Sequence, residues 1–366
     1  MSRRLPIGVM GAGAIGCFVG GRLAARGADV VLVGRERTKA ELVAHGLVLQ
    51  DLEGPDVRVA VGRARLPSLP GPSTEAPGSE GDILFATDAS ALADRDVVLC
   101  CVKSGQTAEA ADRLAAVLGA NAVVVSFQNG VRNADVLRER LPRHTVLGGI
   151  VTFNVVAAGE GVFRRATSGP LVIERREGDA RVEALAQSLR TAGFDVVVPR
   201  DVRPLQWTKL VMNLNNAVGA LSGAPTRDLL FVPGYRRVLA AVIREALAVL
   251  RAARVPTARL GPMPVAVFPY VLSLPTPLLR VVASAQVKVD PEARSSMWQD
   301  LTRGRATEVD HLNGEIVRLA REHGIAAPLN ERTVELVHEV ERAGRGSPNL
   351  SPEALWSALT STARPT

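Results

Sequence analysis

Three glycines near the start of the chain could bring backbone amides close to a phosphate. Gly11, Gly13 and Gly16 form the pattern G-x-G-x-x-G, with Ala14 and Ile15 before the last glycine. In this pattern the first glycine allows a tight turn, the second admits a pyrophosphate, and the third lets a helix pack close to a strand. An apolar strand precedes the motif and a helical segment follows it, which is the context that it requires. We therefore expect a dinucleotide to bind at the amino end of this helix.

The end of the second expected strand bears on which dinucleotide binds. It reads Val33-Gly34-Arg35-Glu36-Arg37. An arginine at this place suits the 2′-phosphate of NADP, whereas an acid suits the ribose 2′-hydroxyl of NAD. Arg35 therefore predicts NADP, Glu36 leaves NAD open, and Arg37 also fits a solvated helix start.

Polar residues follow two consecutive apolar runs that read as buried strands. Lys103 follows DVVLCCV at 96–102, and Asn129 follows AVVVS at 122–126 after an intervening Phe-Gln. The carboxyl ends of parallel strands face the ligand crevice of an open sheet. Either residue alone would be ordinary turn chemistry, but the repetition favours a site for cofactor or substrate.

Two further groups of polar residues lie in the second half of the chain. Lys209 and Asn213 are four residues apart, so they share one helix face, although a lysine at a domain edge could simply extend to solvent. A polar segment that begins near Ser296 leads to Glu308 and Asp310. An acid at a helix start gains from the helix dipole, and plain capping would explain it equally well.

The elements that must position these residues change in kind near residue 201. Before it, strands and helices alternate, which predicts an α/β fold with an N-terminal Rossmann-type, doubly wound parallel sheet. After it, 3.6-residue periodicity predicts a C-terminal all-helical domain. The expected domains are 1–203 and 204–366, and the expected long helices lie at 205–221, 235–254, 295–323 and 330–343.

Composition narrows the class of protein. The chain of 366 residues has a net charge of +7, yet its arginines are scattered and aromatic residues make up only 4%, which argues against a nucleic-acid partner. No apolar run is long enough for a membrane span, and Cys17, Cys100 and Cys101 form no disulfide framework. The histidines show no metal-ligand spacing. We expect a cytoplasmic protein with reduced cysteines and a flexible Pro/Gly-rich surface loop at 66–82.

Taken together, the motifs resemble the ketopantoate reductase (2-dehydropantoate 2-reductase) family. The matching segments occur in family order and cover most of the chain: GAGAIG, VGR, VKSGQT, QNG, KLVMN, SSMWQDLTRGRATEVDHLNG and HGIAAPLN. The resemblance implies NADPH-dependent reduction of ketopantoate to pantoate, a step towards pantothenate and coenzyme A. It implies a small 2-keto acid as substrate, and we keep a homodimer as an expectation.

The resemblance also implies roles for individual residues. Lys209 matches the catalytic lysine, and Glu308 matches the carboxylate that hydrogen-bonds the substrate hydroxyl. The implied substrate-binding residues are Asn129, Asn213 and Ser296. The implied cofactor-binding residues are Gly11, Gly13, Ala14, Ile15, Gly16, Arg35, Lys103, Asn129 and Glu308. We expect Lys209 and Glu308 to converge over the nicotinamide ring.

One departure concerns the substrate. Many family members carry an asparagine eight residues after the lysine, followed by proline, where this chain has Ala217 and Val218. Reduction of another branched 2-keto acid is therefore an alternative. A non-catalytic NADP-sensing protein is a second, and the presence of both Lys209 and Glu308 argues against it.

Overall fold

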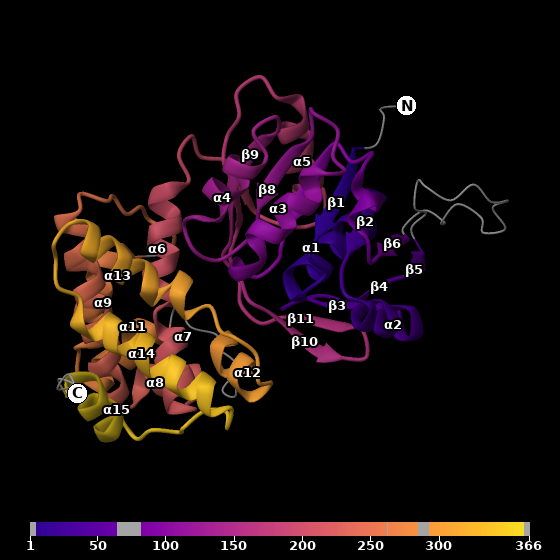
Figure 1. Cartoon of the computed structure of the whole chain (residues 1–366). Helices are drawn as coiled ribbons and strands as arrows, with labels where there is room; N and C mark the ends of the chain where they lie inside the picture. Colours follow the sequence, from indigo (N-terminus) through magenta and orange to yellow (C-terminus); the bar gives the residue numbers. More distant parts are fainter. Residues whose placement is uncertain (1–4, 64–81, 262, 285–292, 362–366) are drawn as a thin grey trace, which may run out of the picture. The chain divides into compact units, whose positions relative to one another are not determined.

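The computed structural model describes residues 5–63, 82–261, 263–284 and 293–361, and it separates into two compact units (Figure 1). The first unit is Met1–Val202 and the second is Arg203–Thr366. Nearly all of the Pro/Gly-rich loop expected at 66–82 lies outside the described residues. In the part of the chain that is described, none of the helices combines the length and apolar character needed to cross a membrane.

The first unit is built on a nine-stranded sheet in the order β13-β12-β9-β8-β7-β1-β2-β6-β5. Neighbouring strands pair in parallel except β12, which runs antiparallel to β9. The strands are β1 (Pro6–Met10), β2 (Asp29–Val33), β5 (Val61–Arg63), β6 (Ile83–Ala86), β7 (Val97–Cys100), β8 (Val123–Ser126), β9 (Thr145–Val151), β12 (Leu171–Ile173) and β13 (Val196–Val197). The predicted fold class is confirmed, with a mixed rather than wholly parallel sheet.

Strand order reverses beside β1, because β2 lies on one side of it and β7 on the other. Ligands of open α/β sheets bind outside the carboxyl ends of the strands at such a reversal. The glycine turn follows β1 and the segment with Lys103 follows β7. The topology therefore places these two predicted segments at the same edge, on either side of the reversal.

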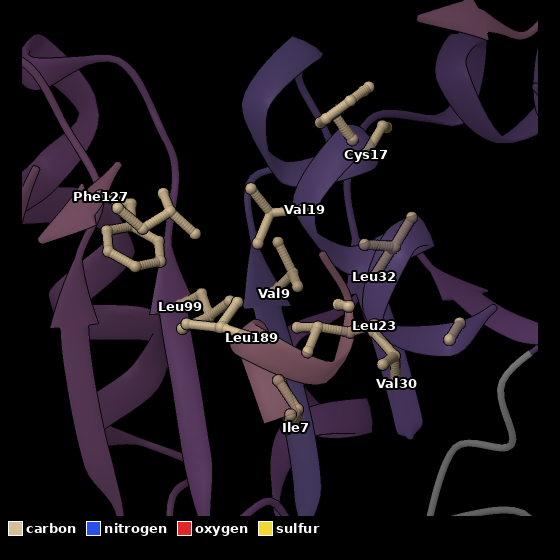
Figure 2. Close-up of a cluster of buried hydrophobic side chains, with 14 of the residues drawn as sticks. Ile7, Val9, Cys17, Val19, Leu23, Val30, Leu32, Leu99, Phe127 and Leu189 are labelled. Atoms are coloured by element: carbon tan, nitrogen blue, oxygen red, sulfur yellow. The ribbon is translucent and has the colours of Figure 1, made fainter. Parts of the chain in front are cut away.

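Both faces of the sheet are buried, which explains why its central strands are continuous apolar runs. Side chains alternate between the faces: Ile7 and Val9 of β1 belong to one core cluster, while Met10 belongs to the other. Figure 2 shows the first cluster, in which β1 packs with α1 residues such as Val19 and Leu23. The unit's helices are α1 (Ala14–Ala24), α2 (Glu36–His45), α3 (Thr107–Ala115), α4 (Asn133–Arg140) and α5 (Ala180–Thr191).

A second, four-stranded sheet in the order β10-β11-β3-β4 was not anticipated from the sequence. It consists of β3 (Leu47–Gln50), β4 (Val57–Val59), β10 (Val155–Gly159) and β11 (Val162–Arg165). Helix α1 contacts strands of both sheets, so it is buried on more than one side. This burial fixes the helix whose amino end carries the glycine motif.

The described part of the second unit contains helices and no strand, as the periodicity predicts. Its long helix α9 (Pro233–Ala252) packs against several of the others. The remaining helices are α6 (Arg203–Asn213), α7 (Asn215–Ser222), α8 (Thr226–Phe231), α10 (Phe268–Leu272), α11 (Thr276–Ser284), α12 (Ser296–Thr302), α13 (Asn313–Glu322), α14 (Pro328–Ala343) and α15 (Pro352–Thr360).

Two helices expected to be continuous are each divided. The helix expected at 205–221 breaks at Leu214 into α6 and α7, where asparagines with low helix propensity flank the break. The prediction of one continuous helix at 295–323 was also wrong, because the structure has two separate helices there, α12 and α13. Gly304 adopts φ +60° after α12, and the chain then runs through a loop and the short 3₁₀ helix Val309–His311 before α13 begins. Glu308 is therefore presented from a loop.

Candidate functional site

The glycine turn is held by backbone hydrogen bonds to the end of β2. The amides of Gly11 and Ala12 both donate to the carbonyl of Val33, at 2.9 and 3.0 Å. Gly11 has φ +110°, a conformation that favours glycine. A Cβ on Gly16 would lie 2.2 Å from the carbonyl oxygen of Gly11, so only glycine lets α1 begin this close to the turn.

Gly13 differs from the other two glycines, because a Cβ built on it meets no atom within 4 Å. It caps α1, and Ala14 and Ile15 form the first turn of the helix. Amides in a first turn have no partner within their own helix and carry the positive end of its dipole. The turn therefore presents an open, positively polarised surface at Gly13, where the structure itself does not require glycine.

Arg35 stands at the carboxyl end of β2, as the residue that caps α2, and its side chain is exposed. Glu36, the residue that left NAD open, begins α2 and lies 3.8 Å from Lys39 in an ion pair. Arg35 thus follows the strand next to β1, at the same sheet edge as the glycine turn.

Lys103 and Asn129 follow the adjacent parallel strands β7 and β8 and are half-buried. Sequence reasoning missed the buried polar network that joins their two loops. Ser104 Oγ donates to the Asn129 carbonyl at 3.0 Å, and Asn133 Nδ2 donates to the same carbonyl and to Ser104 Oγ. Thr107 Oγ1 donates to Asn133 Oδ1 at 2.8 Å. Buried polar groups with satisfied hydrogen bonds make a rigid unit, so the network fixes one loop against the other.

Gln128 extends this network to the backbone that precedes Lys103. Its Nε2 donates to the Val102 carbonyl at 3.1 Å and to Thr107 Oγ1 at 2.7 Å, and its Oε1 accepts from Ser126 Oγ at 2.9 Å. The signal in the sequence was a group of polar residues at the carboxyl ends of two apolar strands, because polar side chains that are buried need hydrogen-bond partners.

In the second unit, Lys209 and Asn213 lie four residues apart on α6, and both are half-buried. The neighbouring Thr208 is buried and anchors the helix. Its hydroxyl donates to the Ala258 carbonyl at 2.7 Å and accepts from the Ala258 amide at 3.0 Å. Apolar side chains of α6, among them Leu210 and Val211, are buried as well. The helix that carries Lys209 is therefore held in place by the residues directly before and after it, Thr208 and Leu210.

Glu308 comes close enough to Lys209 for its charge to act on the ammonium group. Burial lowers the pKa of Lys209 to about 8, and the negative charge of Glu308 opposes that shift. Desolvation disfavours a charged amine, whereas a nearby carboxylate favours it. The structure thus brings these two predicted residues within electrostatic reach of each other in the second unit, and the pKa of Lys209 lies closer to neutral pH than that of an ordinary lysine.

Ser296 is the exposed first residue of α12. The preceding Ser295 is buried and joins two helices: its hydroxyl donates to the Asn216 carbonyl at 2.9 Å and accepts from the Trp298 amide at 3.1 Å. These bonds tie the amino end of α12 to the start of α7. Ser296, the serine predicted from the sequence, is therefore positioned by Ser295. No role was predicted for Ser295 from the sequence.

A polar hollow in the first unit lies away from these residues. It has a volume of about 290 Å³, and its lining includes Arg138, His144, Thr145 and Arg175. Thr145 begins β9, so the hollow lies at the amino end of a strand parallel to β8 and contains no predicted site residue. Among the described residues, no three His, Cys, Asp or Glu side chains gather as a metal site would need.

Comparison with known proteins agrees with the motifs. The family model described as ketopantoate reductase PanE/ApbA matches residues 7–178, and the model of the C-terminal part of the same family matches residues 201–341. A 2-dehydropantoate 2-reductase of Halobacterium salinarum is 34% identical over 342 residues, which is 92% of this chain and 99% of the relative. The corresponding protein of Escherichia coli O157:H7 is 28% identical over 72% of this chain and 82% of its own length.

Solved structures give the same picture. A PanE/ApbA family ketopantoate reductase from Ralstonia eutropha JMP134 superposes with a TM-score of 0.74 at 32% identity, covering 93% of this chain and all of the other. A D-mandelate dehydrogenase solved with NADH and anilino(oxo)acetate has a TM-score of 0.73 at 19% identity over 93% of this chain and 99% of its own, a likeness of fold alone. The resemblance inferred from the motifs is thus confirmed, and the chain belongs to the ketopantoate reductase PanE/ApbA family.

Proposed function

We propose that this chain is an NADP-dependent 2-dehydropantoate 2-reductase that converts ketopantoate to pantoate. The observation that carries the proposal is the Lys209 ammonium group, whose pKa is lowered by burial to about 8 while the negative charge of Glu308 opposes that shift. A reductase of 2-keto acids needs a proton donor for the carbonyl oxygen, and a donor is most effective when its pKa lies near the working pH. The names of the relatives at up to 34% identity support the same substrate.

The glycine turn of the first unit fits a dinucleotide. A Cβ would find open space at Gly13, and the amides that begin α1 suit a pyrophosphate. Arg35 would take the 2′-phosphate, and Lys103 and Asn129 would line the nicotinamide part of the site. When bound, NADPH supplies the hydride that the reaction needs.

The residues of the second unit would handle the substrate. The carbonyl carbon C2 gains hydride, negative charge grows on its oxygen, and the Lys209 ammonium stabilises that charge and transfers a proton to the oxygen. Glu308 would accept a hydrogen bond from a substrate hydroxyl. Asn213 and Ser296 would bind the remaining polar groups of the acid. The lysine regains its proton from solvent before the next turnover.

The direct test is NADPH oxidation, followed by absorbance, with ketopantoate and a panel of other branched 2-keto acids. We expect ketopantoate to have the highest kcat/KM. The reason to include other acids is the pair Ala217 and Val218, which replace the usual asparagine and proline. Both are buried in α7, with exposed fractions of 0% and 1%. Preference for another acid would favour the alternative substrate, and NADPH binding without turnover of any acid would favour a sensor.

Arg35→Ala should change cofactor preference. Loss of a guanidinium–phosphate contact should raise KM for NADPH on the order of tenfold or more, since charge-assisted hydrogen bonds contribute about 1.5–3 kcal/mol. KM for NADH should stay near the wild-type value, because NADH lacks the 2′-phosphate. Parallel kinetics with both cofactors check this, with Arg37→Ala as the matched control at the next arginine. Equal losses for the two cofactors would contradict the assignment.

A further inference from the structure

Helix α14 holds the loop that carries Glu308 through a hydrogen bond to the loop backbone. The Thr307 amide donates to Glu341 Oε1 at 2.7 Å, and Glu341 is a half-buried residue near the end of that helix. This contact joins the residue directly before Glu308 to an element that lies more than thirty residues further along the chain. The loop begins after Gly304 and cannot rely on regular helical bonds.

His338, one helical turn before Glu341, extends the contact to the other side of Glu308. Its Nδ1 lies 2.8 Å from Glu341 Oε2, and its Nε2 lies 2.9 Å from Asp310 Oδ1. A neutral imidazole has a single N–H and can donate to only one of these two carboxylates, whereas the protonated ring can donate to both. Burial alone would lower the pKa of His338, but the hydrogen bonds and charges of Glu341 and Asp310 outweigh burial and raise it.

We propose that Glu341 and His338 are positioning residues for Glu308, because they fix the chain at Thr307 and at Asp310 and so hold the Glu308 carboxylate beside Lys209. The expected effect on turnover rests on the proposed function. The anchoring of the loop follows from the hydrogen bonds alone. Neither positioning residue needs to touch the substrate, since each acts through the loop.

The contacts indicate that Glu341 anchors the loop more strongly than His338 does. Glu341 accepts from the loop backbone and also holds His338, so its removal releases both anchors. His338 reaches Asp310, whose side chain is 62% exposed, so that bond is weakened by solvent and is the lesser anchor. Glu341→Ala should therefore disturb the loop more than His338→Ala does.

The test compares four variants: Glu341→Ala, Glu341→Gln, His338→Ala and Glu339→Ala. Glutamine keeps a carbonyl oxygen for the Thr307 amide, so it should rescue. Glu339 lies on the same helix and pairs with Arg332 at 2.9 Å, so it is the matched control for loss of a carboxylate from α14. Misplacement of a catalytic group by about 1 Å can cost up to about a hundredfold in rate. We expect Glu341→Ala to lower kcat on the order of tenfold or more, and the glutamine and control variants to stay within about twofold.

Hydrogen exchange measured by mass spectrometry on residues 303–312 gives a readout that needs no turnover. Exchange there should be faster in Glu341→Ala, slightly faster in His338→Ala and unchanged in Glu339→Ala. Wild-type exchange and kcat in both Glu341→Ala and His338→Ala would overturn the inference, and so would an equal loss in the control. If Glu341→Ala fails to fold, His338→Ala carries the test. Full activity of Lys209→Ala would instead refute the proposed function while leaving the exchange result intact.

Discussion

Replacement of Lys209 by alanine is expected to lower kcat by a factor on the order of 10² or more, the usual contribution of a positioned proton donor. In the proposed mechanism, loss of the ammonium group removes the proton source and a positive partner for the charge that grows on the substrate oxygen. Steady-state kinetics at pH 7 with saturating NADPH and ketopantoate provide the measurement. Lys209→Arg should not restore the rate, because a guanidinium stays protonated and cannot serve as the donor.

The dependence of kcat/KM on pH provides a second, independent test of Lys209 as the proton donor. A donor must be protonated to act, so kcat/KM should fall as the pH rises through about 8, the pKa of Lys209. Because the Glu308 charge raises that pKa, Glu308→Gln should move the fall to lower pH. Met212→Ala, at an exposed residue of the same helix, is the control for general disturbance of α6. Wild-type kcat in Lys209→Ala would remove the lysine from the mechanism.

Substitutions in the glycine turn should separate folding from cofactor binding. In Gly16→Ala the new Cβ would meet the Gly11 carbonyl oxygen at 2.2 Å, and backbone cannot yield easily. Overpacking of this kind costs about 1–3 kcal/mol, so a lower Tm and loss of NADPH binding are expected together. Gly13→Ala finds open space in an extended conformation, so Tm should not fall.

NADPH affinity should nevertheless decrease in Gly13→Ala, by about tenfold or more, equivalent to about 1.4 kcal/mol. The added methyl group would occupy the space through which a pyrophosphate approaches the backbone. Thermal unfolding and a fluorescence titration with NADPH measure the two effects on the same samples. Unchanged affinity in Gly13→Ala would argue that the glycine turn is only structural and does not bind a dinucleotide.

Local patterns in the sequence determined a large part of this molecule. Strand β1, the glycine turn and α1 follow from an apolar run, three spaced glycines and a helical segment, since backbone sterics and short-range hydrogen bonds decide all three. The change near residue 201 from alternating strands to helices was equally visible in the periodicity. Arg35 and Lys103 could be placed at strand ends because a parallel sheet directs those ends to one edge.

Only the tertiary structure decided how distant residues meet. Periodicity runs through Gly304 without interruption, so the loop that presents Glu308 became apparent only once its left-handed turn and its bond to Glu341 were seen. The approach of Glu308 to Lys209, and the buried network around Asn133, likewise join segments far apart in the chain. Such contacts depend on which helices and strands pack together, and packing is set by the whole core rather than by any short stretch of sequence.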